Sequence, residues 1–388
     1  MSPSHPTVQD LADVMGRIAP LEFAESWDRV GLQVGDPSRP LKGPVLLTID
    51  LTPGVLDEAI RHGAGAIIAY HPPIWEPLKR ITAFSIAERT ILRAVEAGIA
   101  IYSPHTALDA IPGGVADWLC QGLGQPGTGT GDVRAPGDCR ALTPLARKRP
   151  TEEVKVVTFV PHAQADRVRE ALASAGAGII GNYNVCSFEL SGSGTFFGGE
   201  GAKPATGAAG TLQRVAEIRI EMVCSKAALP LAIETLRRFH PYEEPAIDVY
   251  ELLPRPDRYV GPGRRLVLDH AATVRELAER LKVFLGISDV RIALPGDDVP
   301  VSRIGACPGS GGSLATLARQ AGCELYVTGE MNHHEVKAMV LSGVAVLLAG
   351  HTNTERGYLP VLARRLEAEK FAAPIIVSSA DKDPLVTV

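Results

Sequence analysis

Short apolar runs alternate with amphipathic stretches over the first 120 residues, and the alternation resumes after Arg264. Runs such as 44–51 (PVLLTIDL) and 65–70 (GAIIAY) are apolar at consecutive positions, which is typical of strands buried on both faces of a parallel sheet. A helical pattern that opens at Pro53 separates these two runs. The pattern therefore predicts repeated strand–helix units. In these two segments it predicts strands at 44–51, 65–70, 99–102, 265–268, 301–307, 324–329, 344–350 and 374–378, and helices at 53–62, 84–97, 273–284, 312–321, 332–342 and 354–369.

The middle of the chain has a different pattern. Residues 121–150 are rich in Gly, Thr, Pro and Arg, which favours an irregular connection. The elements that follow have the order β-α-β-β-α-β, which is typical of a ferredoxin-like unit. Its Gly-, Ala- and Ser-rich stretch 191–210 predicts a mobile loop between the two halves, and a Pro-rich stretch (254–263) closes the unit. The predicted elements cover 154–160, 165–175, 185–190, 215–223, 226–239 and 246–252.

Two domain organisations fit these patterns. In the first, residues 1–124 and 263–388 form one α/β domain with a mainly parallel sheet, and residues 125–262 are an inserted α+β domain of ferredoxin-like type. In the second, three domains follow one another along the chain. We favour the insertion because the candidate site residues described below come from both ends of the chain and need to meet.

Composition narrows the class of protein. The 388 residues have a net charge of −5, which argues against the basic surface of a nucleic-acid-binding protein. No apolar run reaches the ~20 residues of a membrane span, and the first six residues lack the basic and apolar regions of a signal peptide. The six cysteines include no CxxC pair, which indicates reduced thiols rather than a disulfide scaffold or a zinc ribbon. We expect a cytoplasmic protein without a membrane or nucleic-acid partner.

Histidines and carboxylates gather in the loops after four predicted strands, where open α/β sheets bind their ligands. Five of the ten histidines lie in these loops, and imidazole and carboxylate groups suit zinc, iron, manganese or cobalt. His351 and Glu355 are four residues apart, as are His105 and Asp109, so each pair would share one face of a helical turn. With His71 they make five ligands, a number that suits a pair of divalent ions better than one ion with an open position. The loops are His71–Pro73, Ser103–Asp109, Glu330–Glu335 and His351–Glu355.

Each of these residues also has a purely structural interpretation. Asp109 could cap a helix near residue 112, Thr354 could be a helix N-cap, and His333 and His334 could be a solvated helix start. Glu330 could be a first-turn charge that interacts with the helix dipole. The same residue types recur after four separate strands, and this recurrence favours a metal site over a set of unrelated structural roles.

Candidate groups for binding a substrate flank these loops. The glycine cluster 308–313 could present free backbone amides, with Ser310 and Gly311 at its centre, to a phosphate or carboxylate. It lacks the Lys-Ser/Thr of a P-loop, and a tight turn is an equally good explanation. Lys79 and Arg356 could clamp an anionic substrate, although each could also be an isolated surface charge.

Several of these stretches match the motifs of a known family. The chain resembles the Nif-three-like proteins, also called GTP cyclohydrolase type 2 homologs. The matching stretches are 25–32 (ESWDRVGL), 70–74 (YHPPI), 103–109 (SPHTALD), 328–331 (TGEM) and 350–356 (GHTNTER). The middle unit is similar to the family's optional PII/CutA-like domain and carries the matching stretch 240–246 (HPYEEPA).

The resemblance implies that His71, His105, Asp109, His351 and Glu355 hold two divalent metal ions per chain. It also implies a homohexamer, built as a toroidal trimer of dimers, with the metal sites facing an internal cavity. Many members have a first histidine where this chain has Tyr70, so one metal position has one imidazole fewer.

Two functions are consistent with these features. The first is a metal-dependent hydrolase acting on a nucleotide-like or phosphorylated anionic small molecule, with Glu330 as the catalytic base that takes a proton from water. In this hypothesis Lys79, Arg356, Ser310 and Gly311 bind the anionic group of the substrate. The second is a non-enzymatic protein that stores, delivers or senses metal ions, with the inserted domain as a partner module. The inserted domain favours the second function because it adds no recognisable catalytic residue.

Overall fold

The structure is a computed structural model that describes residues 6–386 except 125–132, 134 and 148. The chain forms two compact units, the first from residues 1–145 and 257–388, the second from residues 146–256. The predicted boundary at residue 125 lies outside the described residues. Residues 138–141 form a strand of the first unit, so this unit extends further along the chain than the predicted 1–124.

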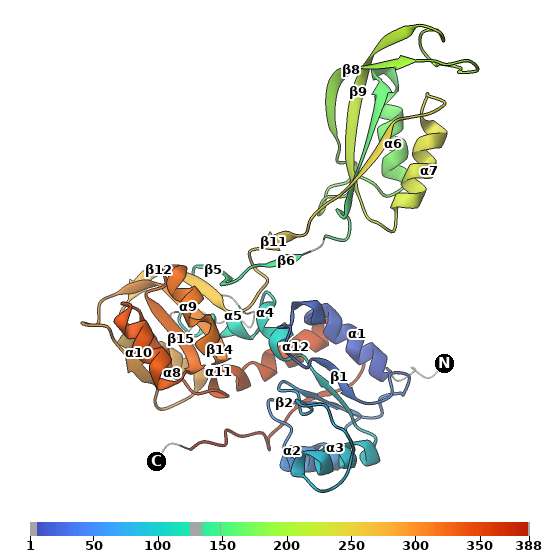
Figure 1. Cartoon of the computed structure of the whole chain (residues 1–388). Helices are drawn as coiled ribbons and strands as arrows, with labels where there is room; N and C mark the ends of the chain where they lie inside the picture. The colour runs from blue at the N-terminus through green and yellow to red at the C-terminus, as the bar shows by residue number, and fades with distance from the viewer. Residues whose placement is uncertain (1–5, 125–132, 134, 148, 387–388) are drawn as a thin grey trace. The chain divides into compact units, whose positions relative to one another are not determined.

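The first sheet of the first unit contains strands from both ends of the chain (Figure 1). Strand β17, near the C-terminus, pairs in parallel with β2, with Ile376 opposite Leu46. The other pairs of this sheet are also parallel except β1 with β4. The order of the strands is β1 (Gly31–Val34), β4 (Ala100–Ser103), β3 (Ala66–Ala69), β2 (Val45–Thr48) and β17 (Ile375–Val377).

Helices cover both faces of this sheet, which explains why its central strands are apolar at every position. Side chains of α2 (Pro53–Arg61) and α3 (Ile86–Ala97) pack on one face. Side chains of α1 (Val8–Ile18) and α12 (Leu359–Ala368) pack on the other. The start of α2 follows from its sequence, because the Thr52 side chain accepts a hydrogen bond from the Val55 N–H and Pro53 needs no such partner.

The second sheet of this unit has six strands, of which β14, β15 and β16 are parallel. Its order is β13 (Arg291–Ala293), β16 (Ala345–Leu348), β15 (Leu325–Glu330), β14 (Val301–Ser310), β12 (Arg264–Ala272) and β5 (Asp138–Ala141). One face packs on α5 (Val115–Gln121) and α8 (Val274–Leu285), and the other on α9 (Gly312–Gln320) and α10 (His333–Leu341). The predicted mixed α/β fold is confirmed, but the strands form two sheets where one was expected.

A buried arginine joins the two segments of the first unit. The side chain of Arg264, on β12, is 1% exposed and pairs with Asp117 on α5. Its guanidinium also donates hydrogen bonds to the carbonyls of Ile111, Gly261 and Gly263. Because a buried charge is stable only with such partners, Arg264 fixes the N-terminal segment against the second sheet.

The second unit has one antiparallel sheet with two helices on one face (Figure 1). The sheet order β10-β7-β9-β8, with a helix after β7 and another after β9, is the ferredoxin-like arrangement. Its elements are β7 (Val154–Pro161), α6 (Ala165–Ser174), β8 (Phe188–Phe197), β9 (Leu212–Cys224), α7 (Leu229–Phe239) and β10 (Ile247–Glu251). The connecting strands β6 (Leu145–Arg147) and β11 (Arg255–Asp257) pair with each other.

Two predictions about local structure were wrong. The stretch 191–210 is not a continuous loop, because β8 continues to Phe197 and pairs with β9 along its whole length. This pairing outweighs the weak strand propensity of Gly and Ser. The single helix expected at 354–369 is divided into α11 (Asn353–Arg356) and α12, because Pro360 has no N–H to continue the helical hydrogen bonds. Among the described helices, none combines the length and apolar character needed to cross a bilayer.

Candidate metal centre

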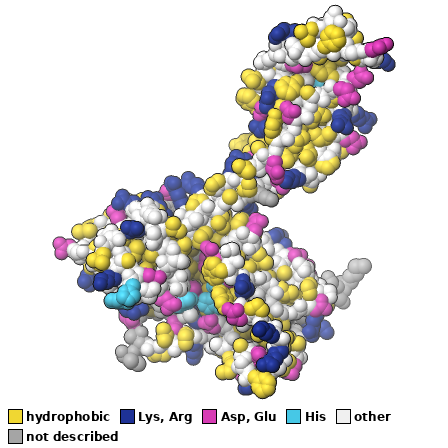
Figure 2. Space-filling model, in the orientation of Figure 1, with side chains coloured by type: hydrophobic (Ala, Val, Ile, Leu, Met, Phe, Trp, Pro, Cys, Tyr) yellow, Lys and Arg dark blue, Asp and Glu magenta, His cyan; other side chains and the backbone are white. Residues whose placement is uncertain are grey.

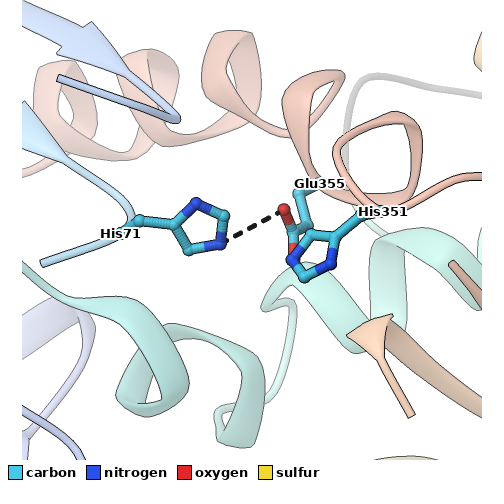
Figure 3. Close-up of side chains that lie close together, drawn as sticks. All are labelled: His71, His351 and Glu355. Carbon is cyan, nitrogen blue, oxygen red and sulfur yellow. Dashed lines mark ion pairs between the residues drawn. The ribbon is translucent and has the colours of Figure 1, made fainter. Parts of the chain in front are cut away.

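Three predicted ligands from distant parts of the chain meet in the first unit. His71 follows β3, His351 follows β16, and Glu355 lies on α11. In Figure 3, His71 points at Glu355 from one side and His351 from the other. His71 Nε2 lies 3.5 Å from Glu355 Oε2, and His351 Nε2 lies 3.4 Å from Glu355 Oε1. Donor atoms bound to one tetrahedral ion at about 2.1 Å are about 3.4 Å apart, so these three side chains are spaced as ligands of one cation.

The carboxylate of Glu355 is buried beside the two histidines and is only partly satisfied by hydrogen bonds. Its side chain is 3% exposed, and Oε2 is buried without a hydrogen-bond partner. An ionised carboxylate in such a place is costly unless a cation compensates it. A divalent ion between the histidines would supply the missing positive charge, so the residues present fit a metal ion.

Backbone without a side chain lies directly beside these ligand atoms. A Cβ built on Gly309 would lie 2.4 Å from Glu355 Oε1 and 3.1 Å from His351 Nε2. The N–H of Gly309 donates to Thr354 Oγ1, which itself donates to the carbonyl of His351. Thr354 thus links β14 to the turn that carries His351, and it is not the helix N-cap, because Thr352 is in that position.

Each histidine of the centre is oriented by a carboxylate. His71 Nδ1 lies 2.9 Å from Asp50 Oδ1, and His351 Nδ1 lies 2.9 Å from Glu330 Oε1. A carboxylate only accepts hydrogen bonds, so Nδ1 carries the proton and Nε2 is the atom left for a metal. Carboxylate–histidine pairs of this kind are typical of metal sites.

The same arrangement is found at His105, next to the group of three. His105 Nδ1 lies 2.7 Å from Asp28 Oδ1, and its ring centroid lies 5.3 Å from that of His71. The backbone φ of His105 is +29°, a left-handed conformation that is costly outside glycine and is often found at functional sites. His105 opens helix α4 (His105–Ala110), which also carries Asp109.

Asp109 lies near His105, and its hydrogen-bond partner is the side chain of Tyr70. The Tyr70 hydroxyl donates to Asp109 Oδ1 over 2.6 Å, so Asp109 does not cap the next helix. Burial raises the pKa of Asp109 to about 7, although the hydrogen bond from Tyr70 and the charge of His105 oppose the rise. In this chain, therefore, Tyr70 is hydrogen-bonded to one carboxylate oxygen of Asp109, a predicted metal ligand.

Glu330 is placed at the centre, in contact with a predicted ligand. One of its oxygens accepts the hydrogen bond from His351, and its side chain is 48% exposed. The contact gives Glu330 a positioning role toward His351. Its role as a catalytic base remains a prediction.

The predicted substrate-binding residues belong to three different segments of the chain. Lys79 is exposed in the segment between β3 and α3. Arg356 donates to Asp381, and its Nε and Nη1 are buried without a partner. The expectation of free backbone amides in the glycine cluster was wrong at two positions. The N–H of Gly311 donates to the carbonyl of Glu330, and the N–H of Gly309 donates to the side chain of Thr354. Ser310 is exposed at the end of β14, opposite Glu330.

Asp28 and Asp50 are contacts of the site that sequence reasoning missed. Asp50 lies two residues after the end of β2, but the predicted strand 44–51 included it, so the rule that selected His71 after β3 did not select Asp50. The hydrogen bond from His71 lowers the pKa of Asp50 against the effect of burial. Asp28 is part of the stretch 25–32, but no pattern within that stretch shows its contact with His105.

The centre lies at the surface of the first unit. The side chains of His71 and His351 are 22% and 34% exposed. Figure 2 shows histidine and carboxylate side chains side by side on the surface of this unit. The two imidazoles of the centre are therefore partly exposed to solvent, whereas Glu355 is buried.

The contacts of Gly309 predict that Gly309→Ala removes metal binding while the fold is kept. The added methyl would occupy the space beside Glu355 Oε1 and His351 Nε2. Gly63→Ala is the matched control, because Gly63 has the same φ of +62° and no atom within 4 Å of its Cβ position. Metal content and circular dichroism of both variants check the prediction. Equal metal content in the two variants would contradict it.

The charges around His71 predict that metal affinity rises with pH well above neutrality. Burial alone would lower the pKa of His71, but the hydrogen bonds and charges of Asp50 and Glu355 raise it to about 10. Below pH 10, a metal must therefore displace a proton from Nε2, and the affinity should rise up to tenfold per pH unit. Titration of metal-free protein with Co²⁺ from pH 7 to 9 measures this slope. A Co²⁺ affinity that does not change above pH 7.5 would contradict the raised pKa of His71.

Known proteins share the sequence and the fold of this chain. A family profile described as Duf34/NIF3 (NGG1p interacting factor 3) matches residues 6–384. A Bacillus subtilis protein named GTP cyclohydrolase 1 type 2 homolog is 34% identical, over 97% of each chain. The Bos taurus protein named NIF3-like protein 1 is 36% identical, over 97% of this chain and 91% of its own. The crystal structure of a Bacillus cereus protein related to NIF3 superposes with a TM-score of 0.71 at 33% identity, covering 99% of each chain. The resemblance found in the sequence is therefore confirmed, and the chain belongs to the Duf34/NIF3 family.

Proposed function

We propose that this protein is a divalent-metal-dependent hydrolase that acts on a nucleotide-like or phosphorylated anionic small molecule. The observation that carries the proposal is the convergence of two histidine Nε2 atoms on the buried carboxylate of Glu355, one oxygen of which has no hydrogen-bond partner. The name of the Bacillus subtilis relative, GTP cyclohydrolase 1 type 2 homolog, supports a nucleotide as the substrate.

The five predicted ligands would hold two ions. His71, His351 and Glu355 would bind the first ion, and His105 and Asp109 would bind the second. Bound divalent ions supply Lewis-acid polarisation and make water more acidic near neutral pH. The proximity of His105 to His71 supports adjacent positions for the two ions.

The protein's own groups have distinct roles in this proposal. Asp50, Glu330 and Asp28 fix the ring orientation and the tautomer of the three histidines. Glu330 would also take up the proton released from water, through the part of its carboxylate that is exposed. Lys79, Arg356 and Ser310 would bind the anionic group of the substrate.

The second unit of the chain favours a second candidate function, which is the storage, delivery or sensing of metal ions. The second unit has its own core of buried side chains. A separate folded unit of this kind suits a partner module better than it suits a simple hydrolase. In that case the metal centre would bind and release ions without turnover.

We also propose that six copies of the chain assemble as a toroidal trimer of dimers. Large apolar side chains remain exposed on the first unit, among them Ile81 (53%), Phe84 (87%) and Ile86 (68%), and contact between copies would bury them. Light scattering should give a mass of about 247 kDa, six times the 41.1 kDa of one chain. A mass of one or two chains at micromolar concentration would contradict this proposal.

Metal analysis of protein purified without a metal-affinity step tests the centre. We expect two divalent ions per chain, and we expect His351→Ala to lose at least one of them because it removes a ligand. His333→Ala is the matched control, because His333 is an exposed histidine at the start of α10, outside the group of three. Equal metal content in the two variants would contradict the assignment of His351.

Turnover of the metal-loaded protein on a panel of nucleotides and phosphoesters, with Glu330→Gln beside it, separates the two functions. Glutamine keeps an acceptor for His351 but is not a base, so a hydrolase should lose about 10²–10⁴-fold in rate with its metals retained. A metal carrier should show no turnover and no effect of this substitution. Retention of both metals without turnover on any compound of the panel would refute the hydrolase proposal.

A further inference from the structure

Two tryptophan side chains lie together at the metal centre. The ring centroids of Trp27 and Trp75 are 5.8 Å apart, and they lie 6.1 and 6.0 Å from the ring of His105. Both are unusually open to solvent, at 52% and 45% exposure. Trp118, the third tryptophan of the chain, is 5% exposed and packs against Phe284 and Tyr358.

The segment that orients His105 also positions the first of these indoles. Trp27 directly precedes Asp28, whose carboxylate binds His105 Nδ1 and the backbone N–H of Thr106. The N–H of Glu25 donates to the Thr106 side chain on the other side of Trp27. Hydrogen bonds on both sides of Trp27 therefore hold its backbone against the loop that carries His105.

The angle between the two indoles determines how a ligand can use them. Their planes meet at 51° and their rings are in contact, so no third ring fits between them. Both indoles are about half exposed beside His105, and we call the pair the aromatic wall. Because the two rings are tilted, a flat ring can stack on the face of one indole and meet the other at its edge. Such stacking tolerates many ring systems, because every nucleobase has a π face.

We propose that Trp27 and Trp75 form a wall that stacks the planar heteroaromatic ring of the substrate, a purine base or a ring of that type, beside the metal ligands. This inference rests on the proposed hydrolase function, whose substrate class it narrows from anionic small molecules to those with a flat ring. The wall contacts the ring, while the cationic groups named above bind the anionic part. The indoles thus select for the ring and orient it toward His105 and His71.

The test compares two ligands that share a sugar and a phosphate and differ in the ring. GMP and ribose 5-phosphate are titrated into full-length, metal-loaded protein, with tryptophan fluorescence and calorimetry as readouts. We expect GMP to quench the emission and to bind at least tenfold more tightly than ribose 5-phosphate. Equal affinities, or GMP binding without quenching, would overturn the proposal.

Substitutions identify the residues responsible. Trp27→Leu and Trp75→Leu should each weaken GMP binding about tenfold or more and leave ribose 5-phosphate binding unchanged, because stacking on a ring is lost. Trp27→Phe and Trp75→Phe keep an aromatic face and should retain most of the affinity. Phe188→Leu is the control, because Phe188 is an exposed aromatic residue on β8 of the second unit.

The outcomes distinguish this inference from the proposed function. Loss of GMP affinity in the leucine variants supports the wall even if no compound is turned over, because binding is measured without catalysis. Turnover that is indifferent to both tryptophans supports the hydrolase and overturns the wall. If the leucine variants change the mass of the protein in solution and not its affinity for GMP, the indoles are a contact between copies, and the inference is also overturned.

Discussion

The centre depends on carboxylates that fix its histidines before any metal arrives. Asp50, Glu330 and Asp28 each hold the Nδ1 atom of one imidazole, and the Nε2 atoms of His71 and His351 face the carboxylate of Glu355. The supporting carboxylates come from loops at the carboxyl ends of strands or from the segment before β1. The two sheets of the first unit therefore matter for function because they bring these ends together, and Arg264 keeps their segments in place.

The second requirement of the site is that the backbone at Gly309 lies close to the side chains of Glu355 and His351. The absence of a side chain at Gly309 allows β14 to pass directly beside Glu355 and His351. Glu355 is then enclosed on all sides by protein, and its second oxygen is left without a partner. This enclosure makes the carboxylate costly in the metal-free protein, and the positively charged groups that reach it are the neighbouring histidines.

Much of the fold could be predicted from the sequence, because the buried strands are short apolar runs and the helices have clear ends, such as Pro53 at the start of α2. The failures occurred where pairing or a single residue outweighs the local pattern, as in the Gly- and Ser-rich part of β8 and at Pro360. The candidate ligands could be named because their types recur after strands. The contact of Asp28 with His105 could not be predicted, since it joins residues 77 positions apart in an irregular segment.

The order of the ligands along the chain has a consequence for biosynthesis. His71 is synthesised long before His351 and Glu355, and the whole second unit lies between them in the chain. Until Glu355 has been synthesised, the nascent protein therefore has only part of the group of three. The complete group can form only after the second unit has left the ribosome, so the order of the residues along the chain sets the order in which unit and site are completed.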